Sequence, residues 1–357
     1  MCSQGCALGY RVKPLRGEEF PPQVSRLVHH RESVMPRRRI GHTDLWVSPV
    51  ALGCWPIAGI TSIGVTETDS LATIQAALDA GINFFDTAYC YGYDGESETL
   101  VGRVLRPHRN EVVIATKCGI HWGRDQKQVK DARPETIRRQ CDESLTRLGM
   151  EVIDLYYLHA PDPRVPVAES AGAMRELLDA GKVRAVGVSN FSQISQYEAF
   201  HAVCPISADQ PHYNMLQREI ETERLPWCQQ HGVSVAVYWP LMKGFLAGKL
   251  ARDHVWDPKD GRQKYPVFQG DQWDQTHDFL DRLRPIAARH DRPLAQLVTA
   301  WTIHRPGITV ALCGAKRPDQ IQESAGAMDL VLTDQDMAEI EQAIRDRGEV
   351  LSRAAVT

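Results

Sequence analysis

Eight short apolar runs recur along the chain, and helical patterns separate them. Such alternation is typical of parallel βα units. Most of the runs are continuously apolar, as strands covered on both faces must be. The pattern therefore predicts an α/β protein built as a (β/α)8 TIM barrel. The runs span residues 49–55, 83–88, 112–117, 154–159, 184–190, 206–210, 233–240 and 308–314.

Helix signals between the runs support this prediction. Pro134 fits the first turn of a helix, an apolar stripe at helical spacing follows as far as Leu148, and Gly149 offers a C-cap. The tetrapeptide LDAG ends two helical patterns, at Gly81 and Gly181, and a new strand follows each time. We interpret this as a repeated βα unit.

Two segments lie outside this regular pattern. Thr333 and Asp336 resemble a capping box that begins a last helix, which we expect to pack outside the barrel. Residues 243–274 are rich in Gly, Asp, Lys and Trp and follow the seventh strand. A loop of this length is usually functional, so we expect a lid or a substrate loop.

The domain organisation is predicted to be one barrel domain with an extension. Residues 1–34 are rich in Arg, His and Pro and lack periodicity, so they are predicted to be a flexible N-terminal extension. The alternative is a start-site artefact, with Met35 as the true start. Residues 35–357 form the predicted barrel. Cys2 and Cys6 have no partner cluster and do not predict a metal site.

The charge and cysteine content narrow the function. A net charge of -4 and a pI near 6.4 offer no basic field for nucleic acid or an anionic membrane, which favours a small-molecule ligand. Nine cysteines spread over the chain indicate reduced thiols in a cytosol-like compartment. No apolar run approaches the ~20 residues that cross a bilayer. We expect a cytoplasmic protein without a metal; the sequence does not predict its oligomeric state.

The active site of a (β/α)8 barrel lies at the carboxyl ends of its strands. Reading the last residues of each predicted strand yields a phenol, an amine, a carboxylate and an imidazole on neighbouring strands. Amide and hydroxyl groups and an aromatic ring follow on later strands. In chain order the residues are Gly53 with Trp55, Asp86 with Tyr91, Lys117, His159, Ser189 with Asn190, Gln210, Tyr238, and Gly314 with Lys316.

Six motifs around these positions resemble the successive motifs of the aldo-keto reductase superfamily, in the same order. They are GINFFDTAYCYG, VIATK, DLYYLH, GVSNF, YWPL and GAKRPDQIQES. The resemblance extends from Pro36 to Met328, and the ordered set is specific where any one motif would be weak. The chain is similar in particular to the prokaryotic branch with sugar-aldehyde reductases and potassium channel β subunits. No G-x-G-x-x-G follows the first strand, so a Rossmann domain is not supported.

The resemblance implies hydride transfer from a nicotinamide to a carbonyl carbon, with Tyr91 as the proton donor. We expect the Lys117 ammonium to lower the pKa of Tyr91, and Asp86 to pair with Lys117. His159 is expected to hydrogen-bond the carbonyl oxygen. Each side chain also has a purely structural explanation. Tyr91 would pack, Lys117 would extend from the strand end into water, and Asp86 would cap the following segment. His159 would be a hydrogen-bonded core histidine. Their joint placement on three neighbouring strand ends favours catalysis.

The resemblance also implies the cofactor contacts. Ser189, Asn190 and Gln210 match the residues that hold the nicotinamide carboxamide, and Tyr238 matches the stacking aromatic. Lys316 and Arg317 favour a 2′-phosphate, hence NADP(H) over NAD(H), although two solvated charges at a helix start are the alternative. The full set at the adenosine-phosphate end is Gly314, Ala315, Lys316, Arg317, Gln320, Glu323 and Ser324, and Gly53 completes the cofactor group.

Two positions depart from the family pattern. Ser324 stands where the family usually has an Asn that contacts adenine, and it is expected to weaken or relax the preference for one cofactor. Trp239 stands where the YSPL-type motif has Ser, and it is expected to reshape the pocket. The predicted substrate-facing group, for which core packing is the alternative, is Trp55, His121, Trp122 and Trp239.

The first functional hypothesis is an NADP(H)-dependent reductase of aldehyde, ketone or sugar carbonyls, or the reverse dehydrogenase. The second is a cofactor-binding regulatory subunit with little turnover, like the channel β subunits. The intact set of Asp86, Tyr91, Lys117 and His159 favours catalysis. A metal-dependent hydrolase would need several His, Asp or Glu ligands that converge at the strand ends. Of these residue types the predicted strand ends offer only His159 and Asp86, which already have roles, so we reject this hypothesis.

Overall fold

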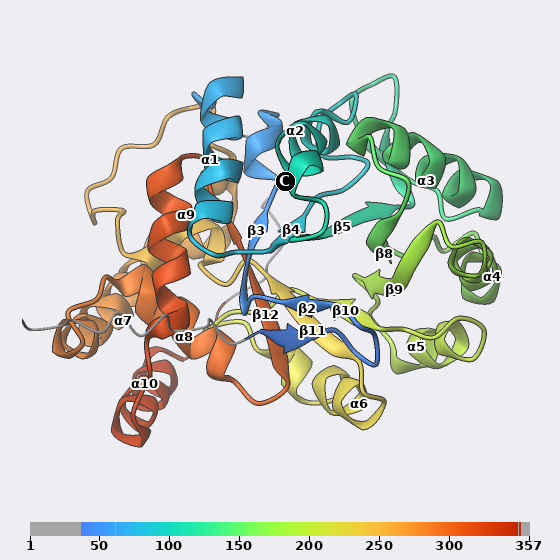
Figure 1. The fold of residues 1–357 in the computed structure, drawn as a ribbon. Coiled ribbons are helices and arrows are strands. Elements are labelled where there is room, and N and C mark those ends of the chain that lie inside the picture. The colour runs from blue at the N-terminus through green and yellow to red at the C-terminus, as the bar shows by residue number, and fades with distance from the viewer. Residues whose placement is uncertain (1–36, 61, 349, 351–357) are drawn as a thin grey trace, which may run out of the picture. The chain divides into compact units, whose positions relative to one another are not determined.

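A closed barrel of eight parallel strands forms the centre of the protein (Figure 1). The structure is a computed structural model that describes residues 37–60, 62–348 and 350; the predicted extension over residues 1–34 lies outside this part. All eight predicted strands are present, in the spatial order β10-β11-β12-β3-β4-β5-β8-β9, so the predicted fold class is confirmed. They are β3 (Val50–Gly53), β4 (Phe84–Asp86), β5 (Val113–Cys118), β8 (Ile153–Leu158), β9 (Val183–Ser189), β10 (Ala208–Gln210), β11 (Ser234–Tyr238) and β12 (Ile308–Gly314).

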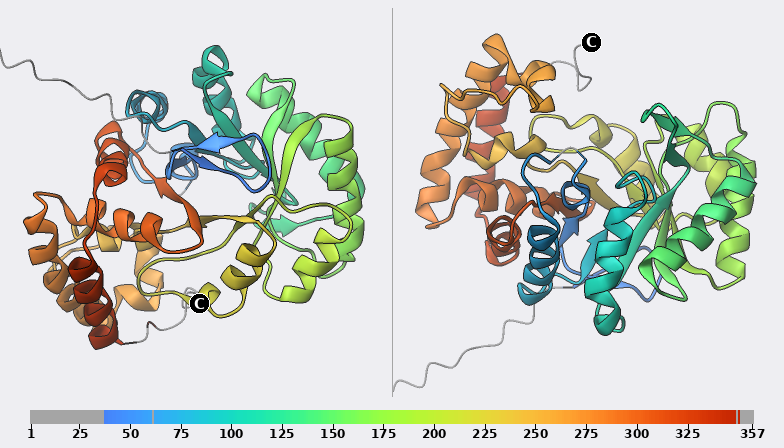
Figure 2. Two further views of the ribbon diagram at one scale, coloured as in Figure 1. Left: turned by 60° about the horizontal axis from the view of Figure 1, so that its bottom comes forward. Right: turned by 90° about the horizontal axis from the view of Figure 1, so that it is seen from above.

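Helices surround the barrel in all three views (Figures 1 and 2). The last helix, α10, packs against α7 outside the barrel, as predicted, and begins with the expected capping box at Thr333. The helices are α1 (Glu67–Asp79), α2 (Glu96–Leu105), α3 (Pro134–Leu148), α4 (Val167–Asp179), α5 (Ile194–His201), α6 (Arg224–Gln230), α7 (Gly270–Arg289), α8 (Leu294–His304), α9 (Pro318–Ala325) and α10 (Asp334–Arg347).

The helix signals read from the sequence are confirmed. Pro134 is the first residue of α3, and Gly149 takes the left-handed conformation with φ 62° directly after Leu148. A residue with a Cβ is strained in that conformation, which is why glycine ends the helix there. The two LDAG segments end α1 at Asp79 and α4 at Asp179, so both belong to the repeated βα unit.

Side chains that point inward from the strands fill the barrel. The interior cluster includes Phe84, Leu155 and Tyr157, all fully buried. Strand β9 places Gly187 next to this tyrosine, and a Cβ there would lie 2.4 Å from its ring. The barrel is therefore a packed core, and only the strand ends are free for chemistry.

A short hairpin, β1 (Arg38–Arg39) and β2 (Trp46–Val47), closes the amino end of the barrel. Its neighbours Ile40 and Leu45 join the interior cluster and are buried. The backbone amide of Gly41 donates to Ser234 Oγ at the start of β11, at 2.8 Å. The hairpin seals the end of the barrel that lies opposite the candidate site.

Two segments between barrel strands matter for the site. A second hairpin, β6 (Ile120–Trp122) with β7 (Gln128–Lys130), lies between β5 and α3, and the sequence did not predict it. The predicted loop after the seventh strand contains three 3-10 segments, η4 (Met242–Ala247), η5 (Gly261–Lys264) and η6 (Pro266–Phe268), before α7 begins at Gly270. Its role as a lid remains a prediction. The other 3-10 segments are η1 (Pro56–Ala58), η2 (Arg106–His108), η3 (Glu219–Glu221) and η7 (Gly326–Asp329).

Candidate active site

A fully buried lysine organises the carboxyl ends of β4 and β5. Lys117 Nζ donates to Asp86 Oδ2 at 2.6 Å, to the Thr87 carbonyl at 2.7 Å and to the Tyr91 hydroxyl oxygen at 3.1 Å. An ammonium has three N–H bonds, so all of them have acceptors here. Gln210 Nε2 donates to the other carboxylate oxygen of Asp86 at 2.7 Å. The structure thus brings Asp86, Tyr91 and Lys117 into direct contact.

The expected lowering of the Tyr91 pKa is not found, because burial and Asp86 shift it upward instead. Burial raises the pKa of the Tyr91 hydroxyl well above its ordinary value, and the Asp86 carboxylate raises it further. The ammonium does not reverse this because it forms an ion pair with Asp86 at 2.6 Å, which offsets its field at the phenol. Burial also raises the pKa of Asp86, although Lys117 opposes the rise. Tyr91 is therefore a protonated phenol at neutral pH.

His159 follows β8 and lies beside Tyr91, with ring centroids 5.9 Å apart at 71°. Burial lowers the pKa of His159 well below its ordinary value, and the Lys117 ammonium lowers it further, so the imidazole is neutral. Its Nδ1 atom contacts the Cys90 thiol at 3.5 Å. The residue as a whole is partly exposed.

Amide and hydroxyl groups form a connected network on the next strands. Ser189 Oγ donates to the Gln210 carbonyl at 2.8 Å, and Asn190 Nδ2 donates to the His159 carbonyl at 2.9 Å. The Tyr238 hydroxyl donates to Asn190 Oδ1 at 2.9 Å and fixes that ring beside the network. The predicted carboxamide group is therefore assembled at one place.

The predicted adenosine-phosphate residues lie at the end of β12 and on α9. Gly53 pairs with Gly314 across β3 and β12, and Ala315 is buried. The backbone amide of Lys316 donates to Gln320 Oε1 at 2.8 Å. Within the described residues Lys316 makes no ion pair, and burial lowers the pKa of its amine.

The other side chains at this end already have partners. Arg317 pairs with Asp319 at 3.2 Å on the surface, and Glu323 pairs with Lys249 at 2.6 Å. The Ser324 hydroxyl is buried and donates to the Gln320 carbonyl of its own helix at 3.1 Å.

Beyond Tyr238, an aromatic and cationic cluster holds the loop after β11. Lys243 Nζ lies 3.7 Å from the centre of the Trp239 ring and 4.3 Å from that of Tyr265. Burial and the neighbouring Arg262 lower the pKa of Lys243 to about 8. Trp239 and Lys243 both have positive φ, 60° and 53°, which is rare for residues with side chains and typical of functional loops. Sequence reasoning missed Lys243 and Tyr265.

The remaining predicted substrate-facing residues lie on the Tyr91 side. Trp55 packs edge-on against Tyr91, with centroids 5.0 Å apart. Trp122 Nε1 donates to the Cys90 carbonyl at 2.9 Å, and its ring contacts exposed Tyr93, which the sequence did not single out. His121 lies on the same hairpin strand, but its Nδ1 is buried without a partner among the described residues.

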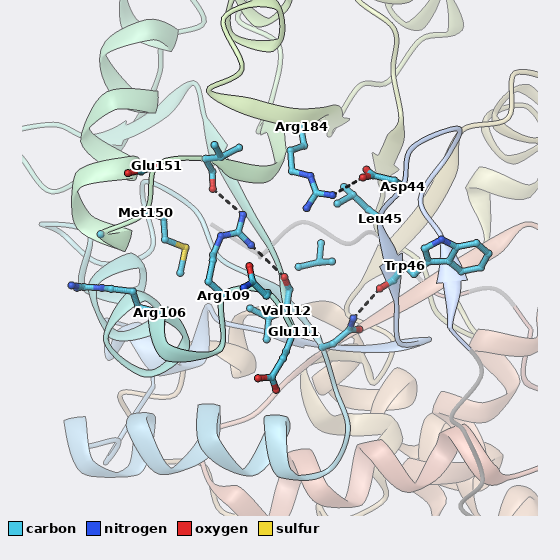
Figure 3. Close-up of a pocket in the computed structure, with 15 residues that line it drawn as sticks. Asp44, Leu45, Trp46, Arg106, Arg109, Glu111, Val112, Met150, Glu151 and Arg184 are labelled. Atoms are coloured by element: carbon cyan, nitrogen blue, oxygen red, sulfur yellow. Dashed lines mark hydrogen bonds and ion pairs between the residues drawn. The ribbon is translucent and has the colours of Figure 1, made fainter.

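A separate cavity of about 630 Å³ lies at the amino ends of the strands, away from this chemistry (Figure 3). Three arginines and three carboxylates line it, so it offers no net charge to an ionic ligand. Arg109 and Arg184 both bind buried Asp154, with N–O distances of 2.8 Å, and Arg184 also reaches Asp44. This end of a barrel serves stability.

The fold and the strand-end set of side chains define an oxidoreductase of the (β/α)8 class. The sequence profile of the Aldo/keto reductase family matches residues 49–345. The chain belongs to the aldo/keto reductase family, so it is an oxidoreductase enzyme that acts on small-molecule carbonyl compounds. Each helix within the described residues is too short or too polar to span a lipid bilayer.

The alignments with known relatives extend over nearly the whole barrel. The chain is 36% identical to aldo-keto reductase YhdN of Bacillus subtilis over 84% of this chain and 91% of that one. It is 34% identical to the NADH-specific methylglyoxal reductase of Escherichia coli over 89% of this chain and 100% of that one. The glycerol dehydrogenase AKR11B4 of Gluconobacter oxydans has a similar structure, with a TM-score of 0.83 and 33% identity over 91% of this chain and all of that one.

Proposed function

We propose that the protein is an NADP(H)-dependent carbonyl reductase, or the reverse dehydrogenase, with Tyr91 as the proton donor. The carrying observation is the 3.1 Å hydrogen bond from Lys117 Nζ to the Tyr91 oxygen. Because that oxygen accepts a hydrogen bond from the ammonium, the phenol O–H is left to donate elsewhere. A carbonyl oxygen at the mouth of the barrel is the acceptor that the chemistry requires.

The side chains at the strand ends fit a nicotinamide nucleotide. Their donor set comprises amides and a hydroxyl for a carboxamide, an aromatic ring for stacking and a lysine for a phosphate. Ser189, Asn190 and Gln210 would hold the carboxamide, and Tyr238 would stack on the nicotinamide. When bound, this cofactor supplies the hydride.

The chain's own residues manage the proton and the developing charge. As negative charge grows on the carbonyl oxygen, Tyr91 transfers its phenolic proton to that oxygen. Lys117 stabilises the phenolate that remains, and Asp86 holds Lys117 in place through the 2.6 Å ion pair. His159 donates a second hydrogen bond to the same oxygen. In the oxidative direction Tyr91 would accept the proton from the alcohol.

The main test compares Tyr91→Phe with Tyr89→Phe, and follows NADPH absorbance with a panel of aldehydes, ketones and sugars. Small polar carbonyls lead the panel, because relatives are named for methylglyoxal reduction and glycerol oxidation. We expect Tyr91→Phe to lower kcat by roughly 10²- to 10⁴-fold. Tyr89→Phe is the matched control, since its hydroxyl bonds to Glu143 at 2.5 Å outside the site.

Two results would contradict the proposal. Unchanged turnover in Tyr91→Phe would exclude the proton-donor role. Tight NADPH binding without turnover of any carbonyl would favour the regulatory-subunit alternative.

The preference for NADP(H) is proposed from Lys316, which lies half-buried at the end of β12 without a carboxylate partner among the described residues. A 2′-phosphate would supply the missing negative charge. One relative is named NADH-specific, so the preference needs its own test. We expect Lys316→Met to raise KM for NADPH about tenfold and to leave KM for NADH unchanged. Equal KM values for the two cofactors in the wild type would refute the preference.

A further inference from the structure

The thiol of Cys90 lies against the His159 ring, on the Nδ1 side. Sγ is 3.5 Å from Nδ1, and the cysteine is 1% exposed. Cys90 also packs in a small apolar cluster with Ala88, Ile120 and Ala160. Among the described residues, Nδ1 is the side-chain polar atom that lies within hydrogen-bonding distance of this sulfur.

Both partners of this contact are fixed by backbone hydrogen bonds. Trp122 Nε1 donates to the Cys90 carbonyl at 2.9 Å, which ties the cysteine to the β6–β7 hairpin. The His159 amide donates to the Cys118 carbonyl at 2.9 Å, and Asn190 Nδ2 donates to the His159 carbonyl at the same distance. The contact is therefore part of the framework of the site.

The chemistry of the two groups decides which one donates. Burial raises the pKa of the Cys90 thiol to about 12, so it keeps its hydrogen at neutral pH. The His159 ring is neutral and carries one N–H, on either Nδ1 or Nε2. If the thiol donates to Nδ1, the ring hydrogen lies on Nε2. In the opposite arrangement the thiol hydrogen would have no acceptor among the described residues.

We propose that Cys90 is a positioning residue that holds His159 as the Nε2–H tautomer. Nε2 then faces away from Cys90 with a hydrogen to donate, as a developing oxyanion requires. Without the thiol, the ring would populate the other tautomer, which presents a lone pair to the carbonyl oxygen. The kinetic consequence rests on the proposed function, but the tautomer is a property of the protein itself.

The test compares Cys90→Ala, which removes the donor, with Cys90→Ser, which keeps an O–H in its place. Cys141→Ala is the control for the loss of a buried thiol, because Cys141 is fully buried in α3. Nitrogen-15 NMR of histidine-labelled protein, assigned with His159→Gln, distinguishes the two ring nitrogens with and without NADPH. Initial rates of carbonyl reduction separate kcat from KM.

We expect the wild type, Cys90→Ser and Cys141→Ala to show protonated Nε2 at His159. Cys90→Ala should show a mixture of tautomers and a kcat lower by about threefold to tenfold, with KM unchanged, as the loss of one hydrogen bond implies. Cys90→Ser should keep kcat within about twofold.

Three outcomes would overturn the inference. A wild-type ring protonated at Nδ1 would do so directly. So would a Cys90→Ala spectrum identical to the wild type, whatever the rates. Equal losses of kcat in the alanine and serine variants would assign Cys90 a packing role only. If the protein turned over no carbonyl at all, the proposed function would fail while the NMR comparison still decided the tautomer.

Discussion

Substitution of Asp154 at the amino end of the barrel should destabilise the protein without altering its chemistry. The carboxylate is fully buried and accepts four hydrogen bonds: two from Arg109, one from Arg184 and one from the Ile114 amide. In Asp154→Asn an N–H group replaces one acceptor oxygen and faces a guanidinium donor. The two arginines then share one neutral oxygen.

The magnitude follows from burial. Removing one partner of a fully buried ion pair costs about 3–5 kcal/mol. The side chains of Arg109 and Arg184 are 27% and 39% exposed, so hydration of the two guanidinium groups offsets part of this free-energy cost. We expect Asp154→Asn to lower the free energy of unfolding by about 2 kcal/mol, measured by urea denaturation. In Asp44→Asn the lost partner of Arg184 is 80% exposed, so the change should stay within about 0.5 kcal/mol. A loss no larger in Asp154→Asn than in Asp44→Asn, or a change in kcat, would refute the reasoning.

Three further predictions concern packing and pH. Gly102→Ala should lower the unfolding free energy by about 2 kcal/mol in thermal melts, because a Cβ there would lie 2.2 Å from the Leu148 carbonyl; a wild-type melt would contradict this. Burial raises the pKa of Asp209 to about 6, so its charge penalises the folded state above that pH. Stability should therefore fall between pH 4 and pH 6 more steeply in the wild type than in Asp209→Asn, and equal slopes in denaturation curves would be the contrary result. Because the pKa of Lys243 is lowered to about 8, its cation–π contacts with Trp239 and Tyr265 should weaken as pH rises through 8 in the wild type, and Lys243→Met has no such contacts to lose; tryptophan fluorescence titrations showing the same inflection in both proteins would contradict this.

The barrel was predictable because buried parallel strands leave mainly apolar runs in the sequence, as most of the eight strands do, although β10 is Ala-Asp-Gln. The two hairpins were not. Strands β1 and β2 have two residues each, too few for a period, and β7 carries exposed Gln128 and Lys130 that look like loop residues. Their positions are set by contacts with distant segments, such as the bond between Gly41 and Ser234.

The ring of site residues was predictable because carboxyl ends of parallel strands meet at one end of a barrel. The sign of the Tyr91 pKa shift was not, since it depends on burial and on the pairing of Lys117 with Asp86. The Lys243 cluster was also hidden. It depends on a left-handed backbone conformation at Trp239. In a sequence that conformation is usually indicated by Gly or Asn, and a tryptophan gives no such indication.

The indole of Trp122 has a consequence for how this enzyme can be altered. It belongs to a hairpin outside the barrel strands, yet its N–H holds the carbonyl of Cys90, one residue before Tyr91. The tip of the hairpin, residues 123–127, lies beyond the paired positions, so changes of sequence there should leave this bond in place. The hairpin and the backbone next to the proton donor are thus joined by this hydrogen bond and by the shared apolar cluster of Ile120 and Cys90, so a substitution at Trp122 should change turnover as well as selectivity.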